Sequence, residues 1–277
     1  MIYISFAFFK EAEPYIHKYQ LKKNMNIHPF SIYYNSYMTI IITGMGVINA
    51  GVCTTYMLSN FEINDEDIFA NIGICGSNHK EHDIRDVVLC NKIIQSWDEK
   101  CRYPDILYQH PFIEGSVETF MNVVEECTPE LKGDTIEMEA AGMFRAASVY
   151  FPLHRMFFIK IISDKLHDVY DVTDESVYDL MNSTSESIVN WLVSVHNTIK
   201  GCHKGLSDVE SDLLAGVKEN MNLTENMYEQ LIKLVVYYKS RQGTVGKVIQ
   251  PYLDIKINSK NERKKYFEEL RNKLKDV

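Results

Sequence analysis

Short apolar runs bounded by polar residues recur along the first 200 residues and predict the strands of a sheet. The clearest runs are 2–9, 38–43, 68–74 and 157–163, with weaker ones at 31–34 and 84–90. Runs of this length that are rich in isoleucine and phenylalanine are typical of strands covered on both faces. The interval from 95 to 123 gives no clear pattern.

Helical spacing of apolar positions separates these runs. We expect helices over 10–19, from the glycines near 46 to about 60, and from about 174 to 199. A further helix should begin with Glu137 and Glu139, continue through Phe144, and end before Pro152. Strands that alternate with helices indicate the α/β class.

The last quarter of the chain has a different pattern. Two glycines within 201–205 indicate a linker, and helical periodicity follows at about 207–220, 223–241 and 259–275. We therefore expect an α/β domain over 1–200 and a helical C-terminal extension over 201–277. The stretch 260–275 is basic and amphipathic, which fits a solvated helix face or a contact with another subunit or partner.

Composition narrows the functional classes. The chain has 277 residues, 45% hydrophobic content and a net charge of −9, so it is globular and unsuited to a broad nucleic-acid surface. Its six cysteines form no C-x-x-C pair, which favours reduced thiols in the cytoplasm. The apolar start is too short and lacks the basic leader of a signal peptide, and no run reaches membrane-spanning length.

Three acidic residues are candidates for chemistry. Glu137 and Glu139 open a predicted helix, and Asp164 follows a predicted buried strand. Ligand sites of open α/β sheets lie beyond the carboxyl ends of the strands. Carboxyl groups that meet in one cleft can protonate a leaving group and position water during cleavage of a sugar bond. Acids at helix starts and strand ends also serve simply as caps, and each residue alone fits that alternative.

The motif Glu-Met-Glu-Ala-Ala at 137–141, followed by Ile-Ser-Asp at 162–164, resembles the 5′-methylthioadenosine/S-adenosylhomocysteine nucleosidases of the nucleoside phosphorylase superfamily. The resemblance covers roughly residues 1–200. It implies a three-layer α/β/α domain with a twisted mixed central sheet. It also implies a cytoplasmic homodimer that hydrolyses a purine nucleoside, with no metal or organic cofactor and with neither nucleic acid nor membrane as a partner.

The resemblance also assigns catalytic roles. Asp164 would donate a proton to the imidazole-ring nitrogen of the purine, which makes the base a neutral leaving group. Glu11, just beyond the first strand, would activate the attacking water. An alternative register places Glu13 in that role.

Further positions follow as substrate contacts. Glu139 would accept hydrogen bonds from the ribose hydroxyls, with Met138 against the sugar face and Glu137 assisting. Gly46 lies in a Gly-x-Gly turn that resembles the ribose-side turn of the superfamily. The substrate-binding set expected from the resemblance is completed by Ser163, Ile74, and Phe112 as a stacking partner of the purine. Tyr108 is an alternative to Phe112, and both also fit the core.

Departures from the family pattern bear on the nucleophile. Asn71 stands where purine nucleoside phosphorylases have a phosphate-binding arginine, and Ile74 stands where a serine is common. Isoleucine has no hydrogen-bonding side chain, so a phosphate ion would lack two partners. Water is therefore the expected nucleophile, and phosphorolysis is the alternative. Lys160 replaces a common arginine, and the interval before Glu137 is short. These two features, together with Ile74 and the helical C-terminal extension, favour a third possibility, a weakened nucleoside-binding or interaction protein on the same fold.

Overall fold

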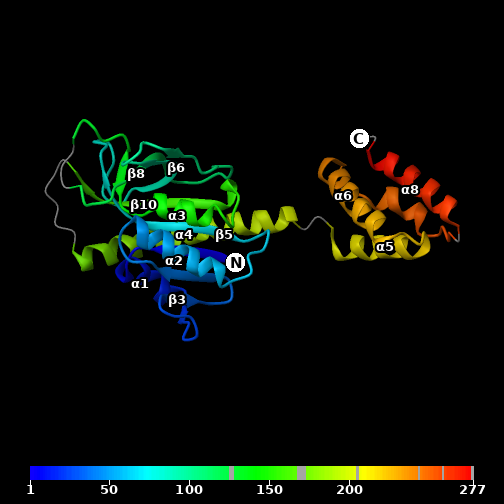
Figure 1. Cartoon of the computed structure of the whole chain (residues 1–277), viewed down its shortest axis with the longest axis horizontal. Coiled ribbons are helices and arrows are strands. Elements are labelled where there is room, and N and C mark those ends of the chain that lie inside the picture. Colours follow the sequence, from blue (N-terminus) through cyan, green and yellow to red (C-terminus); the bar gives the residue numbers. More distant parts are fainter. Residues whose placement is uncertain (125–127, 167–172, 204–205, 243, 258, 276–277) are drawn as a thin grey trace. The chain divides into compact units, whose positions relative to one another are not determined.

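The computed structural model describes residues 1–277 apart from 125–127, 167–172, 204–205, 243, 258 and 276–277 (Figure 1). It separates into two compact units, Met1–Lys200 and Gly201–Val277, each with its own apolar core. In the part of the chain described, no helix combines the length and the apolar character needed to span a bilayer.

A mixed ten-stranded sheet forms the centre of the first unit. Its members in chain order are β1 (Ile2–Phe6), β2 (Lys22–Lys23), β3 (Ser31–Tyr34), β4 (Met38–Ile42), β5 (Ile68–Ser77), β6 (Val87–Gln95), β7 (Cys101–Arg102), β8 (Ile113–Thr119), β9 (Thr135–Glu137) and β10 (Met156–Lys165). β1 pairs in parallel with β4 and β5, and β5 pairs in parallel with β10. β10, β6, β8, β9 and β5 each pair with the next, and β10 also pairs with β5, so these five strands close on themselves.

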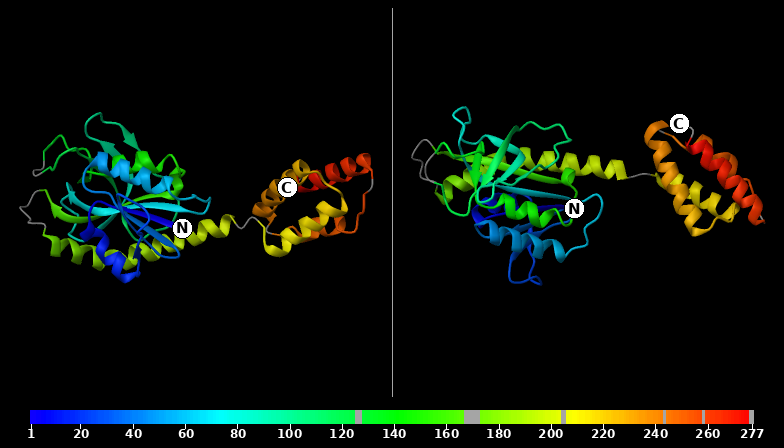
Figure 2. Two further views of the ribbon diagram at one scale, coloured as in Figure 1. Left: turned by 60° about the horizontal axis from the view of Figure 1, so that its bottom comes forward. Right: turned by 45° about the horizontal axis from the view of Figure 1, so that its top comes forward.

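Helices cover both faces of this sheet (Figure 2). α1 (Phe9–Lys18) and α4 (Asp174–His203) pack in one apolar core, and α2 (Val47–Ser59) and α3 (Ala140–Ala147) pack in the other. Strand β10 serves both cores, with Ile159 and Ile161 in the first and Phe158 and Ile162 in the second. This alternation explains the continuous apolar run in the sequence and confirms the expected α/β/α architecture with a mixed sheet.

Two glycines let α2 and α3 cross in backbone contact. An ideal Cβ on Gly142 would lie 2.1 Å from the Val47 carbonyl oxygen, and one on Gly51 would lie 3.4 Å from the Gly142 oxygen. Gly46, the residue before α2, has φ +92°, a conformation that favours glycine. The close crossing places the start of α2 beside the start of α3.

Two expected boundaries were wrong, and one interval without a clear pattern contains a strand. Glu137 does not open a helix: it ends β9, Glu139 is the N-cap residue, and α3 begins at Ala140. α4 continues through His203, so the expected linker is helical over 201–203, and 204–205 lie outside the described residues. The interval from 95 to 123, for which no element was predicted, contains β8. This strand alternates polar and apolar residues and therefore lacks an apolar run.

The second unit is helical. It contains α5 (Asp208–Asn220), α6 (Glu225–Gln242), α7 (Gly246–Ile249), a 3-10 turn at Gln250–Tyr252 and α8 (Lys260–Lys275). The first unit also has a 3-10 turn, at Leu153–Arg155. Leu214, Leu231, Phe267 and Leu270 belong to its buried core. Ser207 caps α5 in a capping box with Glu210, which fixes the start of the first helix.

Candidate active site

Buried charged residues collect where several elements of the first unit meet. Glu11 lies in the first turn of α1, Glu137 ends β9, Glu139 precedes α3, and Lys160 lies within β10. Each is at most 8% exposed. Charged side chains leave water only at a large cost unless they are paired or hydrogen-bonded, so the contacts of each residue indicate what it does.

Glu11 is held by backbone N–H groups. Its Oε2 accepts hydrogen bonds from Ala7 N at 2.9 Å and Phe8 N at 3.2 Å, and its Oε1 accepts one from Ile74 N at 2.9 Å. Burial raises the pKa of Glu11 to about 7, although the Ile74 N–H and the charge of Lys160 act in the opposite direction. A carboxyl group with such a pKa can accept or release a proton near neutral pH.

Gly73 on β5 makes room for this arrangement. An ideal Cβ there would lie 2.9 Å from Glu11 Oε1 and 3.6 Å from Lys160 Nζ. Any side chain at this position would therefore collide with the Glu11 carboxylate. The Glu11 carboxylate and the Lys160 ammonium therefore both border the space beside Gly73.

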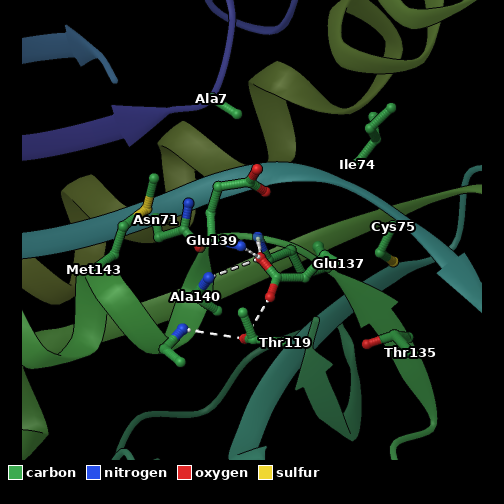
Figure 3. Close-up of polar contacts among 12 residues, drawn as sticks. Ala7, Asn71, Ile74, Cys75, Thr119, Thr135, Glu137, Glu139, Ala140 and Met143 are labelled. Atoms are coloured by element: carbon green, nitrogen blue, oxygen red, sulfur yellow. Dashed lines mark hydrogen bonds and ion pairs between the residues drawn. The ribbon is translucent and has the colours of Figure 1, made fainter. Parts of the chain in front are cut away.

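Glu137 has both carboxylate oxygens occupied (Figure 3). Oε1 accepts a hydrogen bond from Thr119 Oγ1 at 2.6 Å. Oε2 accepts hydrogen bonds from Glu139 N at 2.9 Å, Ala140 N at 2.8 Å and Lys160 Nζ at 2.8 Å. Glu137 thus binds the free N–H groups at the start of α3 and neutralises the buried lysine.

Glu139 extends away from the Glu137 carboxylate (Figure 3). Its Oε1 accepts a hydrogen bond from Gly46 N at 2.8 Å, so it joins the start of α3 to the turn before α2. Burial, followed by the charge of Glu137, raises the pKa of Glu139. Met138, between the two glutamates, is half-buried.

Lys160 is the cation of the cluster. It lies between Phe158 and Ile162 on the face of β10 toward α2 and α3, and its side chain is 1% exposed. Burial lowers the pKa of Lys160, but the charges of Glu137 and Glu139 outweigh that effect and raise it overall. Lys160 is therefore protonated at neutral pH.

Asp164 lies near the carboxyl end of β10, after a bulge that separates it from Ile162. Its Oδ2 is 2.8 Å from Ser163 Oγ, and an ideal Cβ on Gly76 would lie 2.9 Å from its Oδ1. Within the described residues, no hydrogen bond or ion pair joins Asp164 to Glu11, Glu139 or Lys160. The segment 167–172, just after it, lies outside the described residues.

The remaining expected site residues are divided between two places. Gly46 and Ile74 contribute backbone N–H groups to Glu139 and Glu11, respectively. Phe112 lies elsewhere, with its ring edge-on to Trp191 of α4 at 5.4 Å between centroids. Tyr108 packs against Phe157 at 6.1 Å in the same core. Stacking of either ring on a purine stays a prediction.

No site role was predicted from the sequence for two contributors, Thr119 and Lys160. Thr119 donates to Glu137 and accepts a hydrogen bond from Ala141 N at 3.1 Å, but nothing in the surrounding pattern distinguished it. Lys160 did leave a signal, since a charge inside the apolar run 157–163 requires a buried partner. Among the residues that the structure describes, no group of three or more His, Cys, Asp or Glu could hold a metal ion.

Comparison with known proteins gives a family match over part of the first unit. A sequence model described as the Phosphorylase superfamily matches residues 5–117, which include Glu11, Gly46 and Ile74. No curated protein matches the chain by sequence.

Solved structures match a larger share of the chain in fold. The 5′-methylthioadenosine/S-adenosylhomocysteine nucleosidase of Campylobacter jejuni is 16% identical, with a TM-score of 0.57, 68% of this chain and 96% of that chain covered. The corresponding nucleosidase of Colwellia psychrerythraea in complex with adenine is 14% identical, with a TM-score of 0.58 and coverage of 70% and 94%. A mutant futalosine hydrolase of Helicobacter pylori is 14% identical, with a TM-score of 0.53 and coverage of 70% and 98%. Residues 5–117 thus resemble the phosphorylase superfamily in sequence, and the first unit has the nucleoside phosphorylase/nucleosidase-like fold.

Proposed function

We propose that the first unit hydrolyses the N-glycosidic bond of a purine nucleoside similar to methylthioadenosine or adenosylhomocysteine and releases the free base. The observation that carries this proposal is the buried cluster of Glu11, Glu137, Glu139 and Lys160, in a fold shared with nucleosidases. Three carboxyl groups with one ammonium give the site an acidic character. Such a site stabilises the positive charge that builds on the sugar during bond cleavage.

Glu11 is the base of the proposed reaction. A group that removes a proton from water works best when its pKa is close to the working pH, and that of Glu11 is about 7. Its three backbone N–H donors hold the carboxylate in one orientation. Glu11 would therefore orient the attacking water and take its proton.

Glu139 is the proposed ribose ligand. Gly46 N–H donates to Oε1, and the Glu139 carboxylate keeps further lone pairs that can accept a hydrogen bond from a ribose hydroxyl. Met138 would pack on the sugar face. The purine would lie toward the end of β10, where Asp164 donates a proton to the base and Ser163 supports it. Phe112 is the proposed stacking partner of the purine.

Water is the proposed nucleophile because the surroundings of Gly73 offer little to an anion. Asn71 is 1% exposed, and its Nδ2 donates to the Ser5 carbonyl oxygen at 3.3 Å. Ile74 has no polar side-chain atom. Lys160, the cation near Gly73, already pairs with Glu137. A phosphate ion would lack the charge-assisted donors that such ions need.

A base-release screen tests the proposal. Purified protein is incubated with methylthioadenosine, adenosylhomocysteine, inosine and adenosine in buffer free of phosphate, and the free base and free sugar are quantified. We expect release of base from at least one nucleoside without phosphate. Release that requires phosphate would show phosphorolysis. Binding of nucleoside by calorimetry without release would show a binding protein on this fold.

The proposal includes a cytoplasmic homodimer. Its support is a row of exposed apolar side chains at and before the start of α2, where Met45, Ile48 and Val52 are 64%, 72% and 57% exposed. Exposed apolar side chains gathered at one place are typical of contact surfaces. Light scattering after size-exclusion chromatography should give twice the chain mass. A monomeric mass at micromolar concentration would remove this part of the proposal.

A further inference from the structure

The Glu137 carboxylate is buried and hydrogen-bonded to the protein. A carboxylate has about four lone-pair positions for hydrogen bonds. Thr119 Oγ1, Glu139 N, Ala140 N and Lys160 Nζ supply four donors at 2.6–2.9 Å. Three of these donors meet Oε2 and one meets Oε1, and the Glu137 side chain is only 2% exposed, so a ribose hydroxyl could reach the remaining lone pair only if buried neighbours moved. Glu137 is therefore already committed to the protein.

Two of these donors are backbone N–H groups at the start of α3, beside the proposed ribose ligand Glu139. One of them is the backbone N–H of Glu139, and the next is the first N–H of α3. N–H groups at a helix start lack partners within the helix, and a carboxylate there also benefits from the helix dipole. Glu137 thereby fixes the backbone from which the Glu139 carboxyl group extends toward Gly46.

Lys160 pairs with Glu137 and also lies near Glu11. Its Nζ is 2.8 Å from Glu137 Oε2, and the side chains of the two residues are 1% and 2% exposed. The same Nζ lies 3.6 Å from the Cβ position of Gly73, which is 2.9 Å from Glu11 Oε1. One buried ammonium thus borders the groups proposed to bind the ribose and to activate water.

We propose that Glu137 and Lys160 form a positioning pair for the hydrolysis proposed above, and that neither touches the substrate. Glu137 holds the backbone of Glu139 at the start of α3, while Lys160 holds Glu137 and sets the charge beside Glu11. This gives Glu137 a positioning role in place of the substrate contact expected from the sequence.

The pair has a consequence for pH dependence. The titratable groups around it are Glu11 from α1, Glu139 before α3, Cys75 from β5 and Cys90 from β6. The positive charge of Lys160 favours the ionised form of Glu11, so a neutral residue at 160 raises the pKa of Glu11 further. Because the ionised form is the one that accepts a proton, the acid limb of the activity profile should then move to higher pH.

A set of three variants tests the proposal: Glu137→Gln, Lys160→Met and the double variant. Each single change leaves one buried charge without its partner, and displacement of catalytic groups by about an ångström costs about a hundredfold in rate. We expect kcat/KM to fall by about that factor in each single variant. The double variant removes both charges, so it should be about tenfold more active than either single variant. Glu186→Gln is the matched control. Glu186 is an exposed residue of α4 whose ion pair with Lys18 lies outside the cluster.

The pH profile separates positioning from general loss of structure. Lys160→Met should move the acid limb of kcat/KM to higher pH, whereas Lys160→Arg, which keeps the charge, should leave it in place. Circular dichroism confirms that each variant is folded. If Lys160→Met does not fold, the limb is compared between the wild type and Glu137→Gln/Lys160→Met, which also lacks the ammonium. An unmoved limb in the folded variant, or a double variant no better than Glu137→Gln, would overturn the proposal.

Failure of the hydrolytic function is a separate outcome. A wild-type protein that releases no base contradicts that function alone, and the same variants are then compared by calorimetric titration with adenosine. A positioning pair should weaken adenosine binding when either member is changed and restore part of it in the double variant. Absence of adenosine binding in the wild type would overturn both proposals.

Discussion

Glu11 combines full burial with a pKa of about 7, and this has a measurable effect on stability. Its ordinary pKa is 4.5, so the folded protein holds this proton more tightly than the unfolded chain. A raised pKa in the folded state contributes stability that is present below pH 4.5 and is lost as the pH rises through about 7.

We therefore expect Glu11→Gln to remove a pH-dependent part of the unfolding free energy. Between about pH 4.5 and 7 the wild type should lose on the order of 3 kcal/mol more than the variant, because each pKa unit corresponds to about 1.4 kcal/mol. Urea titrations across this range measure the difference. Parallel curves for the two proteins would contradict the assigned pKa.

Asp164 is the proposed acid, and its substitution tests that role. Asp164→Asn keeps the size of the side chain but cannot donate a carboxylic proton, so base release should fall by about two to four orders of magnitude. Ser163 Oγ can donate to the new carboxamide oxygen, so the fold should remain intact. Unchanged release at any pH from 5 to 8 would remove the assignment of Asp164.

Residue motifs in the sequence singled out Glu11, Glu139 and Asp164 as candidates, but they did not predict the contacts of Glu137. Its role depends on a break between strand and helix that occurs within the motif, and on Thr119, which precedes it by 18 residues. Hydrogen bonds between distant segments follow from the closed strand arrangement, which local patterns do not encode.

At the scale of elements, the strands that were predictable are those buried on both faces. β1, β4, β5 and β10 show as apolar runs because helices cover both sides of them. β8 and β9 carry polar side chains that bond to each other, such as Thr119 and Glu137, and they show no apolar run. Their pairing could only be found from the three-dimensional arrangement.

The crossing of α2 and α3 provides a test at this scale. Gly142→Ala places a methyl group in contact with the Val47 carbonyl, so the helices must separate. Overpacking of this kind costs about 1–3 kcal/mol, and the Gly46–Glu139 hydrogen bond should weaken with it. Thermal unfolding and base release should both decline. Gly246→Ala, where an added Cβ meets nothing within 4 Å, is the control, and equal effects of the two changes would contradict the packing argument.

At the scale of the whole molecule, the chemistry proposed here belongs to one unit. All the proposed site residues lie within Met1–Lys200, and the C-terminal unit has a separate core. From residue 201 onward, 14 Lys and Arg stand against 11 Asp and Glu, so this unit carries +3 and the preceding unit carries −12. The two units thus differ in charge as well as in structure.

A truncated chain tests whether the first unit alone carries the proposed activity. A chain that ends after His203, the last residue of α4, keeps both cores of the first unit and should retain base release with an unchanged pH profile. Release by the full chain and by the truncated chain is measured at equal molar concentration. A truncated chain that is folded by circular dichroism but inactive would show that the helical unit takes part in the reaction.

The most direct test of the central claim is the rate of base release in phosphate-free buffer, measured side by side for wild type, Glu11→Gln and the surface control Glu186→Gln. If a buried glutamate activates water at a purine nucleoside, the wild type and the control release base at the same rate, while Glu11→Gln is slower by at least about a hundredfold. Equal rates for Glu11→Gln and wild type, or release only after phosphate is added, would contradict the account.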